Sequence, residues 1–164
     1  MKYSRDLKYA LSAFIVIFFE AAFGKYISIR GALPMLTFAY VIVCALMESD
    51  MSYITVLSVT LGVFSDILYS GSFGIYTLSY CFAAYYTFKY KDSIFASKWL
   101  FLLIDAFILS TIQQFCYMIF HINDIGAKYL LRGFFLKGLS SSLYTTAVCC
   151  LFYFIGGTVF RKRR

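Results

Sequence analysis

The side chains of this sequence most able to do chemistry are three acids inside apolar stretches. Glu20, Asp66 and Asp105 each interrupt a run of hydrophobic residues. A charged carboxylate at the centre of a membrane-spanning helix costs about 2.5–3.5 kcal/mol, so such residues are retained for a functional or structural reason. No two of them lie at helical spacing, so the sequence does not predict a pair of carboxylates acting as general acid and base.

Patterns for nucleophilic or metal chemistry are weaker still. His121 is the single histidine, and the five cysteines include no C-x-x-C pair. A Ser or Cys nucleophile needs a positioned base, and a metal site needs several ligands at suitable spacing. There is also no glycine-rich phosphate loop. We therefore expect no enzymatic activity, no cofactor and no metal site.

Composition indicates that these residues lie in a membrane protein. Hydrophobic residues make up 62% of the 164 residues and charged residues 14%, against about 45–50% and 25% in soluble domains. A membrane-spanning helix takes about 20 residues, so six would leave no room for a separate soluble domain. The sequence predicts an all-α, polytopic six-helix bundle, a single transmembrane domain over residues 1–164, with spans at about 7–26, 33–47, 53–68, 74–88, 98–120 and 131–160.

The distribution of Lys and Arg predicts the orientation of that bundle. The side that would hold both termini receives ten of the 15 basic residues, and cytoplasmic loops are enriched in Lys and Arg. We expect both termini in the cytoplasm. The basic run at 161–164 indicates a topology anchor or a contact with anionic membrane lipids. Basic residues clustered between apolar runs do not indicate nucleic-acid binding.

The third apolar segment carries a stripe of small and polar residues. Ser58, Gly62 and Asp66 recur every four residues, and Thr55 and Ser65 lie near that face. Small residues allow helices to approach closely in lipid, where packing and interhelical hydrogen bonds drive association. We expect this stripe to pack on the fourth segment, whose small face comprises Gly74, Thr77, Cys81 and Ala84.

A turn with two glycines, Gly71 and Gly74, joins these segments. Glycine adopts the positive φ that a tight reversal needs. Asp66 has two open interpretations. Its carboxylate can accept backbone N–H groups at the start of the fourth helix, where the helix dipole favours an anion, or it can bind a partner.

The order of these features resembles the rod-shape-determining protein MreD family. The resemblance rests on Gly62-x-x-x-Asp66, Gly71-x-x-Gly74, and then Tyr80 and Tyr85. It implies that these residues form a partner-binding or structural motif, and that the fold is similar to the substrate-binding subunits of energy-coupling-factor transporters.

The resemblance also implies a setting. The chain would be a multi-pass protein of the bacterial cytoplasmic membrane, part of the elongation machinery that sets rod shape. Its direct partner would be MreC, bound helix to helix. MreB, RodA and a class B transpeptidase would be reached through the complex.

Other polar residues lie inside the remaining segments. Asp105 and Gln113 would share one face of the fifth helix, as a polar pocket, a partner contact or an interhelical hydrogen bond. Glu20 would form an interfacial ion pair with Lys25. The sixth segment has a small-residue face predicted to pack in the core, formed by Gly138, Ser142, Thr145 and Cys149.

Two functions from different classes follow. The first is a non-enzymatic scaffold that binds MreC and couples MreB filaments to side-wall peptidoglycan synthesis. The second is the substrate-binding membrane subunit of a vitamin or small-molecule transporter. That transporter family usually has alanines four apart in its first span. The alanines here, at 10, 13, 21 and 22, never have that spacing.

Overall fold

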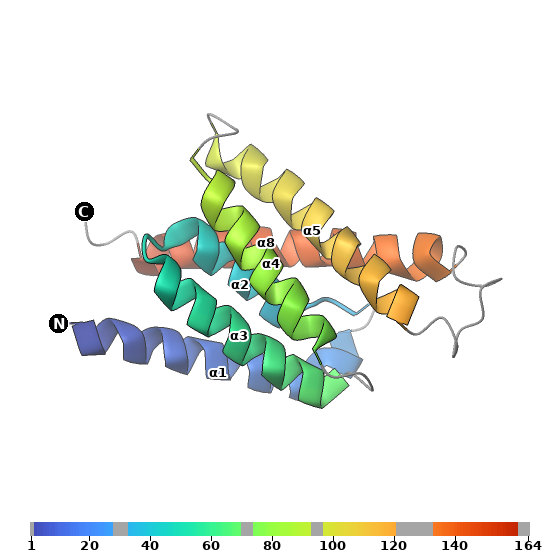
Figure 1. Ribbon diagram of the computed structural model, residues 1–164, viewed down its shortest axis with the longest axis horizontal. Helices are drawn as coiled ribbons and strands as arrows, with labels where there is room; N and C mark the ends of the chain where they lie inside the picture. Colours follow the sequence, from blue (N-terminus) through green and yellow to red (C-terminus); the bar gives the residue numbers. More distant parts are fainter. Residues whose placement is uncertain (1, 28–32, 70–73, 93–96, 121–132, 161–164) are drawn as a thin grey trace.

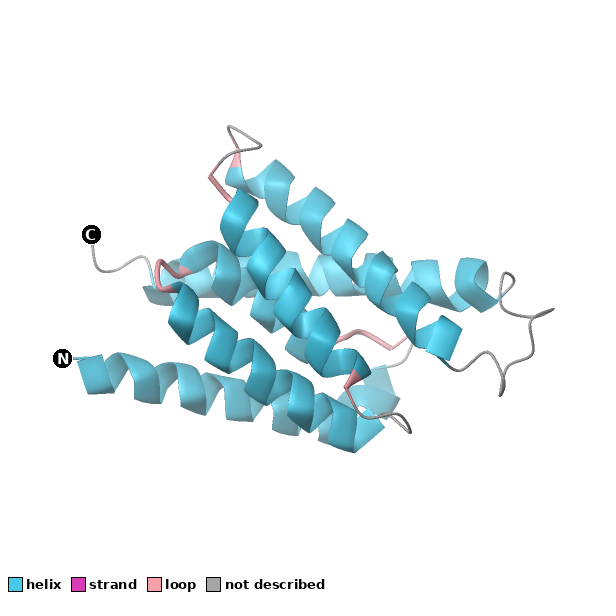
Figure 2. Cartoon of the chain, viewed as in Figure 1, coloured by secondary structure: helices cyan, strands magenta, loops and turns pink. Residues whose placement is uncertain are grey.

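The computed structural model describes residues 2–27, 33–69, 74–92, 97–120 and 133–160. Within these ranges the chain is all-helical (Figures 1 and 2), with six α-helices and no strand. The helices are α1 (Lys2–Ile27), α2 (Leu36–Met47), α3 (Met51–Tyr69), α4 (Ile75–Tyr90), α5 (Lys98–Phe120) and α8 (Leu139–Phe160). A π-helical turn, η1 (Phe134–Gly138), leads into α8.

Successive helices run back and forth along the bundle. As a result α1 begins, and α8 ends, at the same end of the molecule (Figure 1). This arrangement is compatible with both termini on one side of a membrane, while the side itself stays a prediction from the basic residues.

The centre of the bundle is the short helix α2. It has 12 residues, and every residue from Leu36 to Leu46 is buried. At 1.5 Å per residue it is about 18 Å long, which is too short to cross a hydrocarbon layer of about 30 Å. All five other α-helices contact it. Both ends of α2 therefore lie inside protein, and their unpaired backbone groups need partners from neighbouring helices.

Among the described residues, three helices have the length and composition to cross a membrane. They are α3, α5 and the stretch Leu139–Gly156 of α8. The distribution of side chains agrees, because many large apolar residues face outward while several Thr, Ser, Asp and Gln residues lie inside with the apolar core. On α5 the outward stripe is aliphatic along much of its length, with Leu100, Ile104, Ile108 and Ile112 all exposed.

Some predicted boundaries were wrong. The second span was predicted to begin at residue 33, but α2 begins at Leu36. The non-helical backbone at residues 33–35, which includes Pro34, is tied to α8. The third helix, Met51–Tyr69, is longer at both ends than the predicted span of 53–68. The predicted sixth span begins outside the described residues, and its first described turn is π-helical rather than α-helical.

Candidate functional site

A close helix contact joins α3 to α4 at Gly62. A Cβ atom at Gly62 would lie 2.5 Å from the Thr77 Cα and 3.0 Å from the Thr77 nitrogen. These are backbone atoms, which cannot move aside as a flexible side chain can. One turn earlier, the Ser58 hydroxyl donates to the Cys81 sulfur at 3.7 Å. The predicted small-residue stripe therefore lies at the contact, except for Thr55, which faces outward and bonds its own backbone at Met51.

Asp66 lies one turn beyond that contact and caps the first turn of α4. Its Oδ1 accepts the Tyr76 N–H at 2.9 Å, and its Oδ2 accepts the Thr77 N–H at 3.1 Å and the Thr77 hydroxyl at 2.5 Å. The residue at the N-cap position, Gly74, has φ of +105° and offers no side-chain cap. The carboxylate of α3 thus does the work of a helix cap in α4, with the charge that a helix N-terminus favours.

This geometry matches the capping interpretation of Asp66. The side chain is 1% exposed, and both of its oxygens are bonded to α4. Asp66 therefore positions a helix rather than presenting a charge at the surface. Gly71, the other predicted turn residue, lies outside the described residues.

A second acid caps the central helix in the same way. Glu20 of α1 accepts the Thr37 N–H, in the first turn of α2, at 2.6 Å. Glu20 is buried within the bundle. The side chain of Lys25 lies outside the described residues, and the expected ion pair stays a prediction. The Glu20 carboxylate lies inside the bundle because the start of α2 lies there. The first backbone amides of α2 need a hydrogen-bond acceptor at that place.

Thr37 also begins a layer of hydroxyl groups shared by three helices. Its Oγ1 lies 2.7 Å from the Tyr80 hydroxyl oxygen, and the Ser65 hydroxyl donates to the same Tyr80 oxygen at 3.2 Å. All three side chains are buried. Tyr80, one of the predicted motif residues, therefore faces the interior of the bundle and ties α4 to α2 and α3.

The opposite end of α2 is capped by a cation. The Lys91 ammonium, just past the end of α4, donates to the Ala45 carbonyl at 3.3 Å and to the Glu48 carbonyl. A cation suits the C-terminal end of a helix dipole. Burial lowers the pKa of Lys91 below its usual range, and the nearby Lys98 adds to that effect, while Asp92 and Glu48 oppose it.

Asp105 and Gln113 are both buried, but no hydrogen bond joins them. The Thr87 hydroxyl of α4 donates to Asp105 Oδ2 at 2.6 Å. Among the described residues, Asp105 Oδ1 and both amide atoms of Gln113 have no hydrogen-bond partner. The adjacent Gln114 donates instead to the Ser141 hydroxyl at 2.8 Å. Of the roles predicted for Asp105, the structure contains the interhelical hydrogen bond, which is the bond from Thr87.

Tyr85 lies on the opposite side of α4 from Tyr80. With Leu78 and Phe82 it forms an exposed row, which we call the α4 outer stripe; the exposed fractions of the three side chains are 73%, 52% and 52% in chain order. Lys89 extends the row by one turn, with its Nζ 5.6 Å from the centre of the Tyr85 ring. The spacing of four, three and four residues places all four on one helix face.

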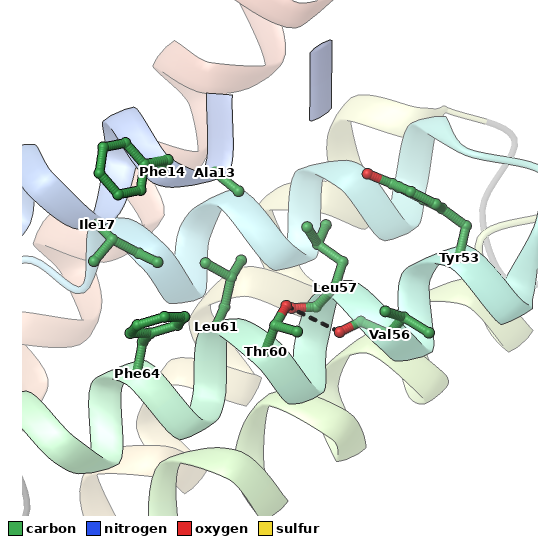
Figure 3. A pocket seen from close by; sticks show the side chains of 9 residues that line it. All are labelled: Ala13, Phe14, Ile17, Tyr53, Val56, Leu57, Thr60, Leu61 and Phe64. Atoms are coloured by element: carbon green, nitrogen blue, oxygen red, sulfur yellow. Dashed lines mark hydrogen bonds between the residues drawn. The ribbon is translucent and has the colours of Figure 1, made fainter. Parts of the chain in front are cut away.

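An apolar groove runs between α1 and α3 (Figure 3). It encloses about 290 Å³ and is lined by Ala13, Phe14, Ile17, Tyr53, Val56, Leu57, Thr60, Leu61 and Phe64. The Thr60 hydroxyl donates to carbonyl groups of its own helix, at Val56 and Leu57. The walls therefore offer an occupant little beyond apolar contact.

Sequence reasoning missed the residues that complete these sites. Thr37, Thr87 and Lys91 carried no motif, because each acts on a helix distant in sequence. The small-residue face of α8 was placed correctly, and Ser142, Thr145 and Cys149 are all buried. In the described part of the chain no three His, Cys, Asp or Glu side chains come together as a metal ion would need.

Comparison with protein families, with curated proteins and with solved structures finds no match to this chain. The functional argument therefore rests on the residues themselves.

The contact at Gly62 predicts that even one added methyl group destabilises the bundle. We expect Gly62→Ala to cost about 1–3 kcal/mol through overpacking, although alanine gains about 1 kcal/mol in helix propensity over glycine. Thermal unfolding in detergent, followed by circular dichroism, measures the change. Gly24→Ala is the matched control, since a Cβ there meets nothing within 4 Å. Equal stability of the two variants would refute the close contact.

The cap at Asp66 predicts graded losses. Asp66→Leu leaves the Tyr76 and Thr77 amides buried without an acceptor, at about 1–3 kcal/mol each, while Asp66→Asn keeps one acceptor and loses about half as much. The control Asp92→Asn changes an exposed acid near Lys98 and should stay within about 0.5 kcal/mol of the parent. Unfolding midpoints in the same detergent compare the three. A leucine variant as stable as the control would contradict the capping role.

The two adjacent glutamines should respond differently to removal of the amide. Gln113→Met removes buried groups that lack partners, so we expect stability to be unchanged or slightly raised. Gln114→Met removes the bond to Ser141 and should cost about 1 kcal/mol. Parallel melting curves test the pair. A large loss for Gln113→Met would show that its amide is bonded by a group outside the described residues.

Proposed function

We propose that this chain is a non-enzymatic membrane scaffold of the bacterial elongation machinery, a multi-pass protein of the cytoplasmic membrane that binds the single membrane helix of MreC. Through MreC it would help couple MreB filaments to RodA and its class B transpeptidase, and so to side-wall synthesis. The proposal starts from the order of Gly62, Asp66, Gly74, Tyr80 and Tyr85, which resembles the MreD family.

The observation that carries the proposal is the α4 outer stripe. Leu78, Phe82 and Tyr85 form one exposed row at the spacing by which a helix meets another helix along a seam. Aromatic anchors are common at the centre of binding surfaces. The outward row of α5 is aliphatic from Leu100 to Ile112, as a face in contact with lipid tails would be, and continues with Phe115.

The inner face of α4 supports the same interpretation. Tyr80 bonds Thr37, Thr87 bonds Asp105, and the first turn bonds Asp66. These ties fix the axial rotation of α4 and therefore hold the outer stripe in one orientation. A rigid seam favours helix docking because little conformational entropy is lost on binding.

The use of the acids also favours a scaffold over an enzyme. Asp66 and Glu20 hold helix N-termini, and Asp105 is tied to Thr87. The described groove is apolar and contains none of these acids. Carboxylates engaged in this way support a fixed bundle that offers its outer surface to a partner.

The test is co-purification of MreC with tagged variants of the α4 outer stripe. We expect Phe82→Ala and Tyr85→Ala together to reduce recovered MreC by about tenfold or more, since loss of two aromatic anchors exceeds about 1.4 kcal/mol. Ile104→Ala with Ile108→Ala is the matched control on α5 and should recover MreC normally. Melting curves of both variants check that each bundle is intact. Normal recovery with the α4 variant would refute this seam, and absence of MreC from the parent preparation would refute the proposed function.

A further inference from the structure

The exposed row on the outer side of α4 has the spacing of a helix–helix seam. It comprises the three residues of the α4 outer stripe and Lys89, at intervals of four, three and four residues. The contact positions of a heptad follow the same alternation. None of the four side chains is small, so a partner could not approach there as closely as α4 approaches α3 at Gly62. The row instead suits a helix whose own side chains interlock with these, as knobs fit into holes.

Lys89 places a positive charge at one end of this row. Its side chain is exposed, and its Nζ lies 5.6 Å from the centre of the Tyr85 ring and 5.4 Å from that of the Tyr90 ring. Both distances are within the range of a cation–π attraction. The ammonium is therefore held against a residue of the stripe, whereas a lysine that serves lipid headgroups extends away from the apolar surface toward water.

The charge of Lys89 is available to a group outside the chain. Two other lysines near the end of α4 are already engaged. The Lys91 ammonium donates to carbonyl groups at the end of α2, and Lys98 lies 3.9 Å from a carboxylate oxygen of Asp92. Among the described residues, Lys89 contacts aromatic rings but has no ion pair. A cation covered by a second helix needs a partner of opposite charge.

From these observations we propose that the helix bound on the α4 outer stripe presents an Asp or Glu carboxylate to Lys89, and that this ion pair sets the register of the two helices. The inference rests on the proposed function and names a feature of its partner, the membrane helix of MreC. A charge at one contact position of a seam selects a single register, because a shift of one helix along the other leaves that charge unpaired. The apolar stripe would then supply attraction, and Lys89 specificity.

Zero-length crosslinking of the co-purified complex tests the contact directly. A carbodiimide condenses a lysine amine with a carboxylate that it touches, and mass spectrometry then identifies the two residues. We expect a crosslink between Lys89 and one Asp or Glu of MreC. Lys89→Arg should retain MreC, because the charge is kept, but lose that crosslink, because a guanidinium does not form the amide. Lys98→Arg is the matched control and should keep the crosslink.

Exchange of the charges tests whether the pair sets the register. We expect Lys89→Gln to lower recovered MreC by about fivefold, as loss of one partly exposed ion pair would, and Lys89→Glu to lower it further. Recovery with Lys89→Glu should return when the crosslinked acid of MreC is replaced by lysine. Lys98→Gln is the matched control and should recover MreC as the parent does. Melting curves of all variants check that each bundle is intact.

The outcomes separate this ion pair from the proposed function. A complex that contains MreC but yields no Lys89 crosslink, or that tolerates Lys89→Glu, would overturn the ion pair and leave the scaffold function standing. So would a loss of retained phosphatidylglycerol from Lys89→Gln, measured by native mass spectrometry, with normal recovery of MreC, since the cation would then serve lipid headgroups. Absence of MreC from the parent preparation would overturn both.

Discussion

The structure depends on carboxylates and an ammonium that cap helices other than their own. Asp66 satisfies the first amides of α4, Glu20 does the same for α2, and Lys91 meets the last carbonyl groups of α2. Each charge has the sign that the helix end favours. In a bundle surrounded by apolar surface, an amide left without a partner costs several kcal/mol. These caps are what allow a helix as short as α2 to begin and end inside the protein.

A buried central helix has consequences for the rest of the bundle. Because α2 is surrounded, the longer helices can only pack around it, and the hydroxyl layer of Thr37, Ser65 and Tyr80 fixes their relative height. The close contact at Gly62 then brings α4 against α3, so that Asp66 reaches the α4 amides. The inner face of α4 is thereby fully engaged, and its other face is left to lipid or to a partner.

This division of α4 into a bonded face and an exposed face gives a physical meaning to the resemblance with the MreD family. Gly62, Asp66, Gly74 and Tyr80 all act on the inner side, where they set the position and rotation of the helix. Tyr85 alone lies on the outer side. A scaffold needs both properties, since a partner helix can select only a surface whose geometry is held constant.

The sequence by itself determined the helical class, the existence of six segments and the role of the small-residue stripe. Long continuous apolar runs favour helices in lipid, because a helix satisfies its own backbone hydrogen bonds. Gly62, at helical spacing from Ser58 and Asp66, leaves a gap that a neighbouring helix fills. It also allowed the capping role of Asp66, because the acid precedes a glycine turn. Only the tertiary structure decided that Glu20 is buried, that Pro34 precedes α2, and that Lys91 and Thr87 have partners. Those contacts join residues many positions apart. When a charged residue has no partner nearby in the sequence, the sequence does not indicate which helix end it will cap.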